Sequence, residues 1–239
     1  MRCALCHNEA TLRNSHIIPE FLYRTLYDAK HRFHQISAAP DRPNQLLQKG
    51  LREPLLCESC EQRLSVCERY ASMFLNGGVG ITVRQNGNRL HLSNLDYKRL
   101  KLFQLSILWR AGVASSPAFS QVRLGPHAER IRRMLATDDP GSTNAYGCIM
   151  FTLMHEQDIL PDLIVAPSPA RLDGHKAYRF VFGGLVFVYI VSSTRPPTYL
   201  VEHFLQESGT AIVKMQQTKE LGFLADSIAK MQRHGKLSE

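Results

Sequence analysis

The sequence lacks any apolar stretch long enough to cross a membrane. Its longest apolar run, GGLVFVYIV at positions 183–191, is less than half of the roughly 20 residues that a membrane-spanning helix needs. The opening residues, MRCALCHNEA, contain no apolar core of the kind that marks a secretory signal. We therefore expect a cytoplasmic protein with no membrane partner.

Internal repeats, low-complexity tracts and a phosphate-binding P-loop are also missing. Because neither GxxxxGKS nor GxxxxGKT occurs in the 239 residues, any nucleotide-driven step must come from another chain. The chain is 44% hydrophobic and 21% charged, a balance typical of a globular protein. Its length suits one large domain or two small ones.

The cysteines are few but arranged in a pattern. Four of the six form two close pairs, Cys3/Cys6 and Cys57/Cys60. Four thiolates with this spacing can close a tetrahedral site, which predicts structural zinc. Two redox-active pairs are the alternative, and they are disfavoured because neither pair lies in the strand–helix context of a thioredoxin-like motif. The other two cysteines lie singly in apolar surroundings and are expected to be buried.

Hydrophobic periodicity predicts an α+β fold in three parts. Residues 1–80 contain the cysteine pairs and a helix that ends at NGG, positions 76–78. Residues 81–140 are expected to form a hairpin with an NGN turn and then two helices, the first with Ser93 and Asp96 as a capping box and Trp109 as a core anchor. Residues 141–239 are rich in β-prone runs, which predict antiparallel strands and a closing helix.

Positive charge is concentrated in the middle of the chain. Residues 81–140 carry ten Lys or Arg against four Asp or Glu, which accounts for six of the net charge of +8. A basic surface suits a polyanion such as nucleic acid, although a solvated helix face explains so modest a charge equally well. The residues expected to contact nucleic acid are Lys98, Arg99, Lys101, Arg130, Arg132 and Arg133.

The helix that follows the second cysteine pair carries a polar stripe. At the helical repeat of about 100° per residue, Glu61, Ser65, Glu68 and Ser72 fall on one face. Two carboxylates on one face, just after the metal ligands, indicate a cation site. The plain alternative is a solvated polar face, and for Glu68 alone this is the better explanation.

Together these features resemble the HNH endonuclease module. In that family a first CxxC, then a histidine before two apolar residues and a proline, then LCxxC at a helix start form a ββα-metal, treble-clef-like unit. Here the matching segments are CALC, SHIIPEF with His16, and LLCESC at positions 55–60. The resemblance covers about residues 1–75. It implies that the four paired cysteines hold structural zinc and that His16 is the general base that activates water.

Three positions depart from the family pattern. Ser15 replaces an acidic residue, Glu61 replaces the helix histidine, and Arg52 stands where an asparagine is usual. Because a hard cation prefers oxygen ligands, Glu61, helped by Glu68, is expected to hold the catalytic Mg²⁺ or Mn²⁺. A site with exchanged ligands is also compatible with an inactive module.

The resemblance therefore implies a metal-dependent endonuclease that hydrolyses phosphodiester bonds in nucleic acid, with DNA favoured. Small proteins with an HNH-like head and an unrelated tail resemble bacterial effectors of anti-phage defence, which implies a separate ATPase or sensor subunit. Two other hypotheses stay open. One is an inactive zinc module that binds nucleic acid or a partner protein, and the other is an assembly subunit whose β-rich part docks on a larger complex.

Overall fold

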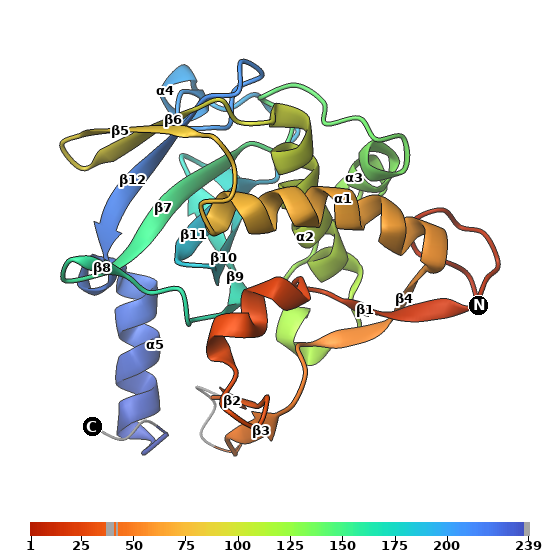
Figure 1. The fold of residues 1–239 in the computed structure, drawn as a ribbon, viewed down its shortest axis with the longest axis horizontal. Helices are drawn as coiled ribbons and strands as arrows, with labels where there is room; N and C mark the ends of the chain where they lie inside the picture. The colour runs from red at the N-terminus through yellow and green to blue at the C-terminus, as the bar shows by residue number, and fades with distance from the viewer. Residues whose placement is uncertain (37–40, 42, 237–239) are drawn as a thin grey trace.

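The computed structural model describes residues 1–36, 41 and 43–236. Its N-terminal part combines short paired strands with one long helix (Figure 1). In chain order the elements are β1 (Leu12–His16), the 3₁₀ helix η1 (Glu20–Leu26), β2 (Phe33–Gln35), β3 (Gln45–Leu47), β4 (Arg52–Cys57) and α1 (Glu58–Leu75). β1 pairs antiparallel with β4, and β2 pairs antiparallel with β3.

The β1–β4 pair and α1 form the frame of this part. β4 runs directly into α1, and Cys57 is the N-cap residue of the helix. In the register of the pair, His16 lies opposite Arg52, and Leu12 lies opposite Cys57. The helix predicted here is confirmed, and it ends at its C-cap, Asn76, as the NGG signal indicates.

The rest of the chain builds an eight-stranded sheet with helices. Its elements are β5 (Thr82–Asn86), β6 (Arg89–Ser93), α2 (Tyr97–Val113), η2 (Pro117–Phe119), α3 (His127–Ala136), β7 (Cys148–His155), β8 (Asp158–Ile159), β9 (Val165–Leu172), β10 (His175–Phe182), β11 (Leu185–Ile190), α4 (Thr198–Val201), β12 (Ala211–Gln217), η3 (Thr218–Glu220) and α5 (Gly222–Arg233). The strand order is β5-β6-β12-β7-β11-β10-β9, with β8 paired to β7. The mixed α+β class is therefore confirmed.

The strand pairing follows the sequence prediction with one exception. The β10–β11 hairpin turns at Gly183 and Gly184, whose φ angles of 58° and 75° are readily adopted only by glycine. The exception is β12, which pairs parallel with β7. The prediction of a purely antiparallel sheet is wrong at this pair, because β12 returns to β7 by a long connection instead of a hairpin.

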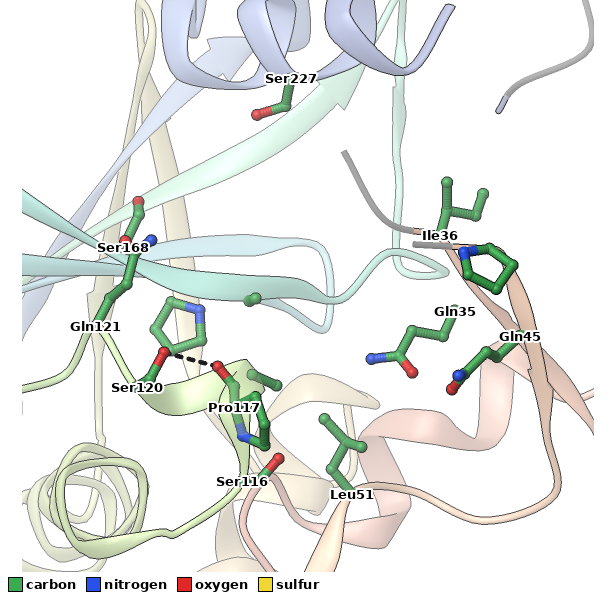
Figure 2. A pocket seen from close by; sticks show the side chains of 14 residues that line it. Gln35, Ile36, Gln45, Leu51, Ser116, Pro117, Ser120, Gln121, Ser168 and Ser227 are labelled. Carbon is green, nitrogen blue, oxygen red and sulfur yellow. Dashed lines mark hydrogen bonds between the residues drawn. The ribbon is translucent and has the colours of Figure 1, made fainter. Parts of the chain in front are cut away.

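A wide pocket lies where the N-terminal part meets η2 and β9 (Figure 2). Its volume is about 730 Å³, and serine, glutamine, proline and apolar side chains line it. Gln35 of β2 points into the pocket, and on the other side the Ser120 hydroxyl donates to the Pro117 carbonyl at 2.8 Å. No charged side chain lines this pocket, so it offers nothing to attract a polyanion.

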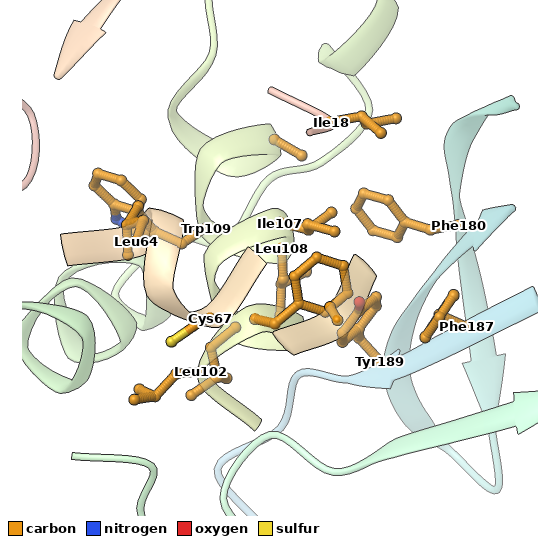
Figure 3. Close-up of a cluster of buried hydrophobic side chains, with 14 of the residues drawn as sticks. Ile18, Leu64, Cys67, Leu102, Ile107, Leu108, Trp109, Phe180, Phe187 and Tyr189 are labelled. Carbon is orange, nitrogen blue, oxygen red and sulfur yellow. The ribbon is translucent and has the colours of Figure 1, made fainter. Parts of the chain in front are cut away.

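Helix α2 occupies the centre of the hydrophobic core. Every residue from Leu100 to Ala111 is buried, which is typical of a helix covered on all sides. Figure 3 shows Leu64 and Cys67 of α1 on one side of α2 and Phe187 of β11 on the other. Trp109 is buried, as predicted. The same cluster of buried side chains reaches from the cysteine pairs to the sheet, so both parts of the chain share one core.

The start of α2 differs from the prediction. The predicted capping box is wrong, because Ser93 belongs to β6 and Asp96 is itself the N-cap of α2. The Asp96 carboxylate accepts the backbone N–H of Arg99 at 2.9 Å, which satisfies one of the free N–H groups of the first turn. Within the described part of the chain, none of the helices combines the length and the apolar character that crossing a membrane requires.

Candidate metal centre and active site

Four cysteine side chains meet where the N-terminal residues reach the start of α1. The Sγ atoms of Cys3, Cys6, Cys57 and Cys60 all lie within 4.8 Å of one another. Tetrahedral zinc with Zn–S bonds of about 2.3 Å separates its sulfur ligands by about 3.8 Å. The sulfurs of Cys6 and Cys57 are 3.8 Å apart. The cluster could therefore hold a metal ion such as zinc, with four thiolates as its ligands.

Local backbone geometry places these thiols. Residues 4–6 form a tight turn, which the His7 N–H closes by donating to the Cys3 carbonyl at 2.9 Å. The turn is joined to β4, because the Ala4 N–H donates to the Leu55 carbonyl at 3.0 Å. The Cys57 N–H in turn donates to the Cys3 sulfur at 3.3 Å. The two cysteine pairs are thus brought together by the chain itself.

The cluster is also prepared to bind a cation electrostatically. The Ser59 hydroxyl, 3.3 Å from the Cys57 sulfur, lowers the pKa of that thiol to about 6. Burial raises the pKa of the Cys60 thiol, so this proton leaves only when a cation compensates the charge. In the part of the chain that the structure describes, no other group of three or more His, Cys, Asp and Glu side chains converges in this way.

His16, at the end of β1, contacts a carboxylate that the sequence analysis missed. Its Nε2 lies 2.7 Å from Oε2 of Glu20, the first residue of η1. The Tyr27 hydroxyl donates to the other oxygen of Glu20, Oε1, at 2.7 Å. Nε2 and Oε2 are shielded from solvent, and neither atom has an aligned hydrogen-bond partner among the described residues, so the 2.7 Å approach is a close ion-pair contact. Tyr27, Glu20 and His16 thus bring a hydroxyl, a carboxylate and an imidazole together, which the HxxxE spacing could have indicated.

The Glu20 contact defines which nitrogen of His16 is available. An N···O separation of 2.7 Å is too short for two unprotonated atoms, so one of them carries a proton. A proton on Nε2 would leave Nδ1 as the acceptor. Burial lowers the pKa of His16 most. The charges of Arg52 and Arg110 also lower this pKa, whereas those of Glu20 and Glu68 raise it. The side chain still keeps 23% of its surface exposed. Solvent therefore reaches part of the imidazole, while burial disfavours its charged form.

Glu61 lies against Ser15 instead of His16. The Ser15 hydroxyl beside its carboxylate opposes the effect of burial on the pKa of Glu61. This hydroxyl donates to the Arg13 carbonyl at 3.3 Å and accepts the Leu56 N–H at 3.1 Å. Oε1 of Glu61 is buried with no partner among the described residues, and burial raises the pKa of the carboxyl. In the part of the chain that the structure describes, no hydrogen bond or ion pair joins Glu61 to His16. Two of the departures from the family pattern, Ser15 and Glu61, instead face each other.

Glu68 is bound by a buried arginine. Nη2 of Arg110 on α2 donates to Glu68 Oε1 at 2.6 Å, and Nη1 donates to the His16 carbonyl at 2.8 Å. Arg110 is only 1% exposed, so its guanidinium joins α1, α2 and the end of β1 inside the protein. An ion pair of this kind leaves Glu68 less available to a catalytic cation than expected. Sequence patterns gave no signal for Arg110, because its partners lie far away along the chain.

Most of the basic residues expected at a nucleic-acid surface are engaged within the protein. Lys101 is buried, its Nζ donates to the Tyr146 carbonyl at 3.1 Å, and burial lowers its pKa to about 8. The prediction for Lys101 is therefore wrong, because α2 is covered on all sides. Of the other five, Arg130 has no carboxylate partner in the described part of the chain. The rest form ion pairs: Lys98 with Asp138, Arg99 with Asp96, and Arg132 and Arg133 with Glu129.

Comparison of the chain with protein-family models, with curated proteins and with solved structures finds no match. The resemblance to the HNH module accordingly depends on the residues of this chain alone. The cysteine cluster, the His16–Glu20 contact and the position of Glu61 are the observations on which a functional proposal can be built.

Proposed function

We propose that the chain is a metal-dependent endonuclease of the HNH type, which hydrolyses phosphodiester bonds in DNA. The observation that carries the proposal is the contact between His16 and Glu20. A carboxylate on one imidazole nitrogen fixes the tautomer, and it stabilises the imidazolium that forms when the other nitrogen takes a proton. His16 therefore has the properties of a general base, at the position where the resemblance expects one.

In this proposal His16 Nδ1 accepts a proton from the water that attacks the phosphorus. General-base catalysis of this kind contributes a factor of typically about 10²–10⁴. Glu61 is the residue best suited to hold Mg²⁺ or Mn²⁺, because its buried Oε1 lacks a partner among the described residues. When bound, such an ion stabilises negative charge on the phosphate and the leaving oxygen. Magnesium commonly needs only one or two carboxylates, since water and substrate phosphate complete its shell.

We also propose that β1, β4 and α1 form a ββα-metal, treble-clef-like unit with zinc in the cysteine cluster. The two pairs of thiols support this, because they join the turn before β1 to the start of α1. The zinc then fixes the strand that carries His16 relative to the helix that carries Glu61. Such positioning matters, since a misplacement of about 1 Å can reduce a rate roughly 10²-fold.

The test is a cleavage assay on supercoiled plasmid, linear DNA and RNA, with Mg²⁺, Mn²⁺ or EDTA. His16→Ala is expected to abolish cleavage while zinc content and melting temperature stay unchanged. His91→Ala, on the exposed face of β6, is the matched control and should cut like the wild type. Cleavage that survives His16→Ala, or that needs no divalent cation, would contradict the proposal.

The role of Glu61 is tested separately. Glu61→Ala should lose cleavage by weakening cation binding, and excess Mn²⁺ should restore part of it. Glu61→His, which brings back the usual family ligand, should keep some activity or change the metal preference. If Glu61→Ala cuts at the wild-type rate and with the same metal dependence, the cation is held elsewhere.

A zinc module that binds nucleic acid or a partner protein without cutting is the second candidate. It is favoured by the pairing of Glu68 with Arg110, which removes one of the two expected cation ligands. Binding without cleavage in the presence of each metal would select it. A role in anti-phage defence with a separate ATPase or sensor subunit, inside the cytoplasm, is the setting that the resemblance implies for the nuclease.

A further inference from the structure

One hollow in the surface is lined by cations and by no carboxylate. It has a volume of about 360 Å³ and lies between α3, the loop before β7 and the loop after β11. Two arginines line it, Arg130 and Arg195, together with small polar side chains that include Asn144, Ser192 and Thr194. This composition differs from the neutral pocket of Figure 2.

Both arginines remain free to bind an anion. Neither forms an ion pair with a carboxylate in the part of the chain that the structure describes, whereas their neighbours Arg132 and Arg133 share Glu129. Both side chains belong to exposed residues. Arg130 and Tyr146 line the same wall of the hollow, and the charge of Arg130 opposes the rise that burial causes in the pKa of Tyr146.

A lysine, Lys176, extends the positive charge beyond the hollow, and two histidines stand behind its lining residues. His127 Nδ1 lies 3.1 Å from the Tyr146 hydroxyl, and His175 Nδ1 lies 3.3 Å from Oγ1 of Thr194, so a histidine stands behind each of these two lining residues. Burial lowers the pKa of His127 most, and the charges of Arg130 and Lys176 lower it further. Both cations therefore lie close to His127. The positive surface is therefore longer than the hollow itself.

We propose that this surface binds the phosphate groups of a nucleic-acid strand, an inference that rests on the nuclease function proposed above. A guanidinium matches the geometry of phosphate and can donate two parallel hydrogen bonds to it. Serine, threonine and asparagine side chains are common donors to backbone phosphates. Contacts to phosphate carry no base information, so the surface positions a strand independently of its sequence.

The experiment measures binding without cleavage. The full chain carrying His16→Ala is titrated, without added Mg²⁺, into a short fluorescein-labelled DNA duplex, and anisotropy is followed over a range of salt concentrations. Arg130→Gln and Arg195→Gln are each added to this background. Each should weaken binding about 10-fold at low salt and reduce the slope of log K against log salt by about one, because each phosphate contact contributes about 0.9 to that slope.

Arg84→Gln, an exposed arginine on β5 at the far end of the sheet, is the matched control and should change neither value. Melting temperatures of all variants verify that they remain folded. Unchanged affinity and slope in the Arg130→Gln/Arg195→Gln double variant would overturn the inference. Displacement of the duplex by inorganic phosphate at matched ionic strength would also overturn it, because the hollow would then bind free phosphate. Binding of poly-glutamate as tight as that of the duplex would overturn it as well.

The experiments distinguish failure of the phosphate-binding surface from failure of the proposed nuclease activity. A protein that binds DNA through the two arginines but cuts no substrate with any metal keeps this surface and overturns the nuclease. If the double variant in the wild-type background cuts DNA with unchanged KM and kcat, the nuclease stands and the binding surface is overturned.

Discussion

The N-terminal part and the helix α2 region both hold polar groups inside the protein, but they satisfy them differently. In the N-terminal part, ionisable groups meet one another, as the four thiols do and as His16 and Glu20 do. In α2, buried cations find partners inside the protein: Lys101 binds the Tyr146 carbonyl, and Arg110 binds the His16 carbonyl and the Glu68 carboxylate. The first arrangement needs a metal ion or a shared proton to be stable, whereas the second is largely complete within the chain.

This difference separates groups that can act on a ligand from groups that hold the fold. A thiol cluster without a cation, and a carboxylate oxygen without a donor such as that of Glu61, are costly in a folded interior. Buried cations bonded to carbonyls have already found their partners. Variants at both kinds of group, those that can act on a ligand and those that stabilise the fold, test this difference.

Removing one thiol should have the largest effect. Cys57→Ser is expected to release zinc and unfold much of the N-terminal part, because metal binding to structural zinc sites supplies about 10–16 kcal/mol of apparent free energy in small zinc-binding peptides. Zinc analysis and thermal unfolding followed by circular dichroism measure this.

Cys67→Ser is the control, since Cys67 is a buried thiol on the same helix but outside the cluster. It should retain one zinc per chain. Absence of zinc from wild-type protein purified without chelator would show that the cluster is not a zinc site.

Removing the buried guanidinium should come next. Arg110→Met is expected to lower the free energy of unfolding by about 3–5 kcal/mol, because it leaves the Glu68 carboxylate without its counter-charge. Arg99→Met, in the exposed first turn of the same helix, should change it by less than about 0.5 kcal/mol. Urea denaturation compares the two. Equal effects would mean that Arg110 contributes no more than a surface residue.

Neutralising Glu20 should affect catalysis more than stability. Glu20→Gln is expected to slow cleavage roughly 10²-fold, since His16 loses the carboxylate that stabilises its protonated form. Nitrogen NMR of His16 should show the proton on Nε2 in the wild type and a mixture of tautomers in the variant. This readout does not depend on activity. A His16 that carries its proton on Nδ1 in the wild type would refute the assigned role of Glu20.

Replacing Lys101 should have the smallest effect, and it should be stabilising. Lys101→Met removes a charge whose burial lowers its pKa from 10.5 to about 8, a shift that corresponds to about 3 kcal/mol. Less about 1 kcal/mol for the lost hydrogen bond to Tyr146, we expect a gain of about 2 kcal/mol at pH 7. The folded pKa is about 8, below the usual 10.5, so between these values the unfolded chain binds more protons and stability rises with pH. Urea denaturation at neutral and alkaline pH should show this rise in the wild type and its loss in the variant.

The elements that could be predicted from sequence are those encoded by short-range spacing. Two CxxC pairs predict a four-thiol cluster, because the two-residue spacing within each pair already brings its two sulfurs close together. Helix α1 and the β10–β11 hairpin follow from periodicity and from a GG turn. Three features depended on contacts distant in sequence: the burial of Lys101, the pairing of Lys98 with Asp138, and the parallel pairing of β12 with β7. Arg195 was missed because its segment has no net excess of charge.

Glu20 is the instructive case for the candidate site. It lies four residues after His16, so the pair was visible in the sequence. What could not be seen was that the strand ends at His16 and a 3₁₀ helix begins at Glu20, so that the three residues between them bring Glu20 back to the imidazole. Glu61 shows the converse, since its helical position was predicted correctly while its neighbour, Ser15, was not.

The place of β12 between β6 and β7 has a consequence for biosynthesis. Among the described strands, the β5–β6 hairpin reaches the rest of the sheet only through this strand, which is translated after β7, β9, β10 and β11. Until residues 211–217 leave the ribosome, β6 and β7 each present an unpaired edge, the feature that most readily templates aggregation. At translation rates of about 5–20 residues per second, several seconds pass between synthesis of the β5–β6 hairpin and synthesis of β12. Chaperone dependence should therefore be greatest for nascent chains that end just before residue 211.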